Sequence, residues 1–347
     1  MNISRSLLRC VKTVSDLKYS TNIQKSCQEI IIPVPWGHIA GKWWGPTDKR
    51  PILSIHGWQD NCGTFNRLIP LLTNDVGFLT IDLPGHGLSS KLPHGMYYFS
   101  VGYITLIETL RRYLGWDKIS LMGHSLGGVL SYTYGMIYPN IVDFAICLDA
   151  AKPMIRRQNN VHMAKAIDNF LRFSQYEMSN EEPPSYTIDE IKKKICAPNK
   201  DSVHYEHSHH IMERMIAPSK KNPGKFYFTR DNRLKAGGLV NFPQNEILEY
   251  TETMKFPIFI GKATKSSYYE IKENFYEVLA VLKRSSKDCS FHYIEGTHHY
   301  HLNNPESVSD LLNEFIKKHN VEDRSIGGIK KEMIVDVEDK RRAICSL

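Results

Sequence analysis

Strand-length apolar runs alternate with amphipathic stretches along most of this 347-residue chain. The apolar runs are short and bounded by turn residues, which is typical of strands buried in a sheet. We predict strands at residues 28–33, 37–44, 51–55, 77–81, 119–123, 142–148, 257–260 and 290–294. The first two flank a Pro-Trp-Gly turn at residues 35–37 and should form a hairpin.

Apolar residues at helical spacing occupy the intervals between these runs. Tyr103, Ile107 and Leu110 repeat at this spacing, and Gly115 follows where such a helix should end. Further helices are predicted at residues 64–72, directly after the turn at 123–127, at 269–282 and around 305–315. This alternation predicts an α/β core, in which a mostly parallel eight-stranded sheet carries helices on both faces.

The alternation breaks after the sixth strand and returns about a hundred residues later. The intervening stretch is mixed and polar, with a lysine run at 192–194 and histidines at 204, 207, 209 and 210. We interpret it as a mostly helical cap inserted into the core. The predicted divisions are an N-terminal tail at 1–26, the core at 27–152 and 255–319, the cap at 153–254 and a loosely held C-terminal tail at 320–347.

Composition is that of a globular protein and excludes several classes. No run of 18 apolar residues exists that would predict a membrane-spanning helix. The net charge is +7, but the basic residues are interspersed with acidic ones. They form no stripe with interleaved aromatics, so we do not expect nucleic-acid binding.

The cysteines and the two ends of the chain bear on its compartment. Seven scattered cysteines without C-x-x-C spacing favour a reducing, intracellular compartment over a disulfide framework or a zinc site. Arg5, Arg9 and Lys12 lie among serines with no acid before Asp16, a composition typical of a mitochondrial presequence. The final Ser-Leu lacks the basic residue that would complete a peroxisomal Ser-Lys-Leu signal. We expect the cytoplasm, with mitochondria and peroxisomes as alternatives.

One turn carries the candidate chemistry. Residues 123–127 read Gly-His-Ser-Leu-Gly, directly after a predicted strand and directly before a helical run. In such a Gly-x-Ser-x-Gly turn the serine is held in a strained conformation, and the glycines leave room for it. Ser125 is therefore the candidate nucleophile. Because a free hydroxyl is a poor nucleophile at neutral pH, it needs a base to take its proton.

The motifs together resemble the α/β-hydrolase family. In order they are His-Gly-Trp at 56–58, Asp-Leu-Pro-Gly-His-Gly-Leu-Ser at 82–89, Gly-His-Ser-Leu-Gly at 123–127 and Gly-Thr-His-His at 296–299. Within the family the chain is most similar to the serine hydrolase-like proteins, through His-Gly-Trp-Gln-Asp-Asn at 56–61, Leu-Pro-Gly-His-Gly-Leu-Ser-Ser at 83–90 and Thr-Arg-Asp-Asn-Arg-Leu at 229–234. The resemblance covers roughly residues 28–318 and implies a triad in the order serine, acid, histidine.

The resemblance implies a catalytic histidine after the last strand. Aligning residues 301–306 with the usual family ending assigns the base to His298, with His299 as the alternative. His301 should pack or form local hydrogen bonds.

The triad acid is harder to assign, because the loop after the seventh strand lacks the aspartate that is usual in the family. Lys265 stands about where that aspartate would be. The resemblance offers a second location at the end of the sixth strand, where this chain has Asp149. Glu270 is the next choice, and a serine–histidine dyad is the third. We carry Asp149 forward as the predicted acid.

An oxyanion needs two backbone donors. The resemblance assigns them to the amides of Trp58, after His-Gly, and Leu126, after the nucleophile. Neither a phosphate-cradling glycine loop nor a dinucleotide fingerprint is present, so we predict no cofactor. A solvated helix face explains the cap histidines better than a hydrolytic zinc site, so we predict no metal.

Two functional hypotheses follow. In the first, the chain is a serine hydrolase that cleaves an ester, thioester or amide bond of a small acyl substrate through an acyl-enzyme. In the second, it is a catalytically weak or inactive hydrolase fold that binds ligands, its acid lost with the change to Lys265. We favour the enzyme, because Ser125, His298 and both oxyanion positions are retained together.

Overall fold

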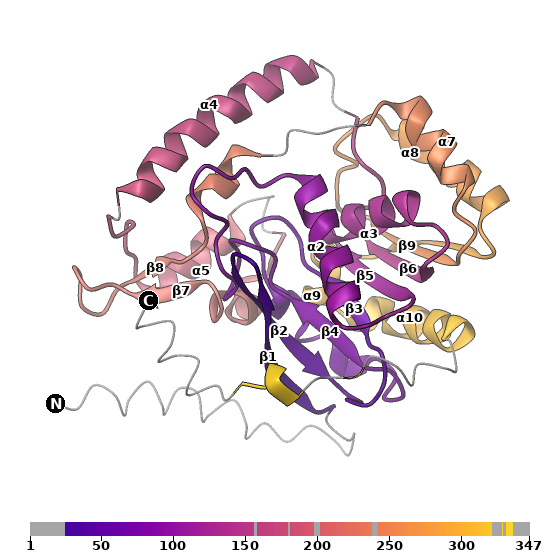
Figure 1. Cartoon of the computed structure of the whole chain (residues 1–347), viewed down its shortest axis with the longest axis horizontal. Helices are drawn as coiled ribbons and strands as arrows, with labels where there is room; N and C mark the ends of the chain where they lie inside the picture. The colour runs from indigo at the N-terminus through magenta and orange to yellow at the C-terminus, as the bar shows by residue number, and fades with distance from the viewer. Residues whose placement is uncertain are drawn as a thin grey trace.

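An eight-stranded sheet forms the centre of the molecule (Figure 1). The computed structural model describes residues 25–155, 158–179, 181–197, 202–237, 242–320, 328 and 331–335. The strands of the sheet are, in chain order, β1 (Cys27–Val34), β2 (Gly37–Trp44), β3 (Ile52–Ile55), β4 (Phe78–Ile81), β5 (Ile119–His124), β6 (Val142–Leu148), β9 (Ile258–Ala263) and β10 (Cys289–Ile294). The predicted fold class is confirmed.

The strand order is β1-β2-β4-β3-β5-β6-β9-β10. β2 runs antiparallel to both of its neighbours, and every other neighbouring pair is parallel. Parallel strands end at the same edge of a sheet. The loops that leave β3, β5, β6, β9 and β10 therefore gather at one edge, which is where ligands bind in open α/β sheets.

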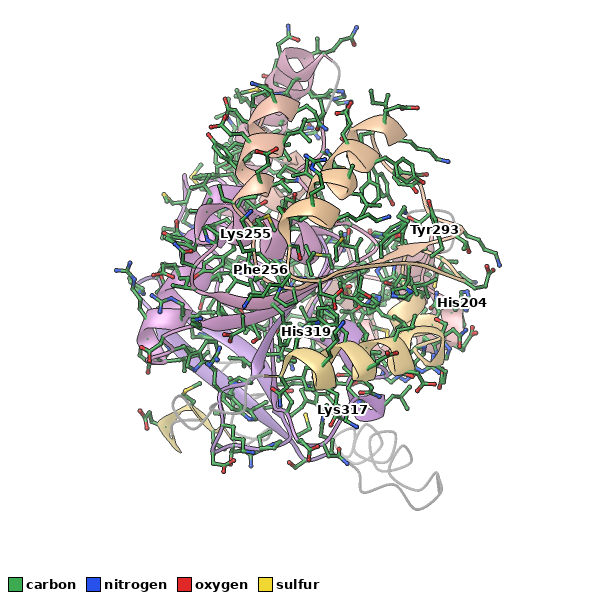
Figure 2. The ribbon with its side chains drawn as sticks, turned by 90° about the vertical axis from the view of Figure 1, so that its right-hand side faces the viewer. His204, Lys255, Phe256, Tyr293, Lys317 and His319 are labelled. Carbon is green, nitrogen blue, oxygen red and sulfur yellow. The ribbon has the colours of Figure 1, made fainter. Side chains whose placement is uncertain are left out.

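Helices cover both faces of the sheet, and each face buries its own apolar cluster. The larger cluster includes Leu110, Leu130 and Leu279, and the smaller one includes Phe144 and Phe315. Figure 2 shows the helix that carries Lys317 and His319 on one side of the sheet and other helices on the opposite side. The helices next to the sheet are α2 (Ser100–Tyr113), α3 (Leu126–Ile137), α7 (Gln244–Glu252), α8 (Lys272–Ser285), α9 (Tyr300–Asn303) and α10 (Glu306–His319).

Between β6 and β9 the chain leaves the sheet and forms a mostly helical inserted segment, for which we keep the predicted bounds 153–254. Before α7 it contains α4 (Asn159–Met178), α5 (Ile188–Cys196), η3 (Tyr205–His207), α6 (His209–Met212), β7 (Ile216–Pro218), β8 (Phe226–Phe228) and η4 (Asn232–Ala236). α4 runs along the outside of the molecule (Figure 1). No helix among the described residues is both long and apolar enough to cross a membrane.

A buried arginine ties the inserted segment to the sheet. Arg214, just after α6, donates from Nη2 to Asp82 Oδ2 at 2.8 Å and from Nη1 to Glu29 Oε1 at 2.6 Å. Asp82 follows β4 and Glu29 belongs to β1, so one guanidinium joins three separate parts of the chain. Both the Arg214 and Asp82 side chains are almost wholly buried.

Two local predictions are wrong. The chain forms two 3-10 turns, η1 (Cys62–Phe65) and η2 (Ile69–Leu71), where we predicted one helix at 64–72. Pro70 interrupts that stretch, because proline has no N–H to continue a helical ladder.

The second error concerns the C-terminal tail. Residues 331–335 are not loosely held: they form η5 (Lys331–Met333), bury Met333 completely and pair Ile334 with Ile30 of β1. The expected targeting segment at 1–15 and the final residues 336–347 lie outside the described part of the chain.

Candidate active site

The turn between β5 and α3 holds Ser125 with φ 53° and ψ −114°. A serine rarely adopts this conformation, and its neighbours must be small for the turn to close. A Cβ atom on Gly123 would lie 2.0 Å from the Gly127 carbonyl carbon, and one on Gly127 would lie 1.9 Å from Ile55 O. Glycine at both positions is thus a packing requirement.

Unusual backbone conformations cluster at the same edge of the sheet. Besides Ser125, the described non-glycine residues with positive φ values are Gln59 (61°), Asp149 (62°) and Tyr269 (62°) near this edge, and Gln158 (52°) before α4 of the inserted segment. Gln59, Asp149 and Tyr269 follow β3, β6 and β9. Strained backbone commonly accumulates at functional sites, and here it marks the ends of four strands.

His298 and Asp149 form a direct hydrogen-bonded pair between His298 Nδ1 and Asp149 Oδ2. Both side chains are buried. Two hydrogen bonds hold this pair next to Ser125: the Ser125 amide donates to Leu148 O at 2.9 Å, and the His124 side chain donates from Nε2 to His298 O at 2.9 Å. Among the described residues no hydrogen bond joins Ser125 Oγ to His298, and such contacts often tighten only when substrate binds.

Asp149 has three further donors, all from β9 and the loop that follows it. Lys262 Nζ and the Ala263 amide each donate to Asp149 Oδ1 at 2.7 Å, and Ser266 Oγ donates to Asp149 Oδ2 at 2.5 Å. Lys262 is buried with its partner. Our sequence reasoning missed Lys262, although a lysine inside the apolar run 258–263 was a visible signal.

Lys265 and Glu270, which complicated the prediction of the triad acid, contact residues other than His298. Lys265 is exposed and pairs with Glu295 at 2.8 Å. Glu270 accepts from Lys152 Nζ at 2.7 Å and from the Ile155 amide at 3.0 Å. Among the candidate carboxylates, Asp149 is therefore the one that the fold places on His298.

The two predicted oxyanion donors belong to segments next to Ser125. A Cβ atom on Gly57 would lie 3.3 Å from Ser125 Cβ, so the loop that contains Trp58 passes directly beside Ser125. Leu126 is the first residue of α3, whose initial amides have no partner within the helix. Neither amide donates to a protein group among the described residues.

The remaining histidines near the site brace its turns. His56 Nε2 accepts from the Leu83 amide at 2.9 Å, and His86 Nε2 accepts from the Gln59 amide at 3.1 Å. His299 Nδ1 pairs with Ser202 Oγ at 2.7 Å, and His301 Nε2 pairs with Thr64 Oγ1 at 2.9 Å. Burial lowers the pKa of both His299 and His301, which disfavours the charged form of each ring.

Comparison with known proteins gives a consistent result. A family model described as "alpha/beta hydrolase fold" matches residues 50–253. A Drosophila melanogaster protein named "Probable serine hydrolase" is 35% identical over 300 residues, which cover 85% of this chain and 89% of that protein. The "Serine hydrolase-like protein" of Danio rerio is 31% identical over 303 residues, covering 86% and 91%.

Solved structures share the fold at low identity. A hypothetical protein from Pseudomonas aeruginosa PAO1 has a TM-score of 0.72 at 22% identity and covers 84% of this chain and 99% of that one. The thioesterase domain from the curacin biosynthetic pathway has a TM-score of 0.65 at 18% identity, covering 83% and 99%. The family model, the relatives and the sheet agree that this chain belongs to the α/β-hydrolase family and, within it, to the serine hydrolase-like proteins.

Proposed function

We propose that the chain is a serine hydrolase that cleaves an ester, thioester or amide bond through an acyl-enzyme. Ser125 is the nucleophile, His298 the general base and Asp149 the acid that orients the base. The observation that carries the proposal is the hydrogen bond between Asp149 and His298 beside the Ser125 turn. The names of two relatives, "Probable serine hydrolase" and "Serine hydrolase-like protein", are consistent with it.

The proposed reaction follows from the placement of these groups. His298 Nε2 takes the proton of Ser125 Oγ while the oxygen attacks the substrate carbonyl. The amides of Trp58 and Leu126 donate to the oxyanion that forms, and His298 returns the proton to the leaving group. His298 then takes a proton from a water molecule that attacks the acyl carbon, the bond from that carbon to Ser125 Oγ breaks, and His298 returns the proton to Ser125 Oγ as the acid product leaves.

Asp149 keeps the base in the productive tautomer. Because Asp149 Oδ2 can only accept from His298 Nδ1–H, the lone pair of neutral His298 lies on Nε2, the nitrogen that must accept the serine proton. The other donors to Asp149, among them Lys262 and Ser266, prevent the carboxylate from rotating away.

The binding-protein hypothesis loses its main support. It rested on a lysine in place of the acid, but Lys265 pairs with Glu295 on the surface, whereas His298 has a buried carboxylate partner. The proposed function is tested by labelling the whole chain with a fluorophosphonate probe. Wild type should be labelled and Ser125→Ala should not; equal labelling of both would overturn the proposal.

A further inference from the structure

Three donor atoms from distant parts of the sequence converge beside the Ser125 turn. They belong to Asp60 in the loop after β3, His124 at the end of β5 and His299 after β10, and one ligand atom from each residue lies within 4.8 Å of the other two. In the described part of the chain this is the single group of three or more such side chains at metal-binding distances.

Two of the three atoms have lone pairs without a partner. His124 Nε2 must carry the proton of its ring, since the atom that it contacts is the His298 carbonyl oxygen, which can only accept. His124 Nδ1 is therefore a bare acceptor, and it is buried without a hydrogen bond. Asp60 Oδ2 is also buried without one, while Asp60 Oδ1 accepts from the Asn61 amide at 2.8 Å.

Burying these two acceptors near each other without hydrogen bonds destabilises the fold unless a positively charged group lies between them. His299 supplies the third atom. Its Nδ1–H can donate to Ser202 Oγ, which leaves a lone pair on Nε2 and fixes the ring in the way that outer partners fix metal-binding imidazoles. His299 Nε2 lies 3.6 Å from Asp60 Oδ2, beyond hydrogen-bond length. It is close to the separation of about 3.4 Å between two ligands of one tetrahedral zinc ion.

We propose that Asp60, His124 and His299 bind a divalent transition-metal ion, with Zn²⁺ as the best match to two imidazoles and one carboxylate. Positions 60, 124 and 299 are too far apart in the sequence to form a recognisable metal-ligand motif, which is why the sequence analysis predicted no metal.

The experiment is a Zn²⁺ titration by calorimetry on the chelator-treated full chain. Asp60→Asn removes the carboxylate, and His299→Asn removes Nε2 while its amide can still reach Ser202. The control is the double variant His204→Asn and His207→Asn, from the histidine cluster of the inserted segment; His204 is labelled in Figure 2. Ser125→Ala is titrated as well, because it separates metal binding from hydrolysis.

Wild type, Ser125→Ala and the control should each bind one Zn²⁺ per chain at this site. Affinity should fall at least about 100-fold in Asp60→Asn and His299→Asn, since even loss of an outer partner costs 10- to 100-fold. Co²⁺ bound to wild type should give visible absorption bands that Asp60→Asn lacks. Unchanged affinity in both site variants, loss of binding in the control alone, or no binding by wild type would each overturn the site. Zn²⁺ binding without fluorophosphonate labelling of wild type would overturn the proposed function and leave the metal site standing.

Discussion

At the scale of single residues, one hydroxyl carries the proposed chemistry. Ser125→Ala should lower the hydrolysis of a short p-nitrophenyl ester by about 10⁴- to 10⁶-fold and leave the circular dichroism spectrum unchanged. The matched control is Ser131→Ala, because Ser131 Oγ lies nearby in α3 but donates to Gly127 O at 2.8 Å. This control should keep near-normal turnover. Comparable rates for Ser125→Ala and wild type would remove Ser125 from the mechanism.

Two adjacent histidines provide a second comparison. His298→Ala removes the proposed base and should cost several orders of magnitude in kcat, as loss of a triad member does elsewhere. His299→Asn should cost less than about tenfold, since the His299 ring pairs with Ser202 and faces Asp60. Both rates are measured in the presence of chelator. The opposite ranking would transfer the role of base to His299.

The acid and its lysine can be tested together. Lys262→Met keeps the length of the side chain and removes the charge that lies 2.7 Å from Asp149 Oδ1. Because Lys262 Nζ donates to Asp149 and helps to fix the carboxylate that contacts His298, this change should lower kcat with little effect on KM. Steady-state kinetics on the purified variant measure both constants, and an unchanged kcat would show that Lys262 does not position the acid.

Asp149→Asn should lower kcat by roughly 10⁴-fold, as in the worked triad example. It should also lower the melting temperature, because it leaves the buried Lys262 ammonium without its carboxylate partner. A fully active and stable Asp149→Asn protein would leave the proposed triad without its acid.

At the scale of elements, Arg214 holds the inserted segment against β1 and β4. Arg214→Met should destabilise the protein by about 3–5 kcal/mol, because it leaves the buried Asp82 carboxylate uncompensated. The control is Arg112→Met. The wild-type Arg112 side chain is exposed, and its ion pair with Glu108 should contribute less than about 1 kcal/mol to the free energy of unfolding. Denaturant unfolding measures both changes.

The pH dependence of that effect has a definite sign. Burial by itself raises the pKa of Asp82, but the charge and hydrogen bonds of Arg214 outweigh it, so the pKa lies below its ordinary value. A depressed carboxyl pKa stabilises the fold above the ordinary value of about 3.9, and this contribution is lost as the pH falls. The stability gap between wild type and Arg214→Met should therefore be wider at about pH 7 than at about pH 2. A constant gap would show that the charge of Asp82 is not what Arg214 stabilises.

At the scale of the whole molecule, the C-terminal region returns to the first strand. Met333 is completely buried in the larger apolar cluster, and the Val335 amide donates to Glu29 O at 3.2 Å. Met333→Ala should cost about 2–5 kcal/mol and lower the melting temperature. The neighbouring Ile334→Ala is the control, because Ile334 is 45% exposed and should have a smaller effect. Equal melting temperatures for wild type and Met333→Ala would show that this contact does not stabilise the fold.

What the sequence determined by itself is local or periodic. The strands and most helices follow from short-range patterns of apolar residues, and the Ser125 turn follows from glycines within two residues of it. Such features depend on backbone conformation and burial over a few residues, which neighbouring residues largely control. This reasoning failed in two places. The helix-breaking effect of Pro70 was overlooked, and the pairing of residues 331–335 with the distant strand β1 could not be read from the sequence.

Only the tertiary structure decided which distant side chains meet. Asp149 and His298 are separated by 149 positions, and Glu270 remained the next choice for the acid until the order of β6, β9 and β10 gave the position of each carboxylate. The buried Lys262 and the convergence of Asp60, His124 and His299 have the same origin. Parallel strands bring their carboxyl ends to one edge whatever their separation in the chain. The physical reason is that these contacts depend on strand order, and sequence spacing carries no record of strand order.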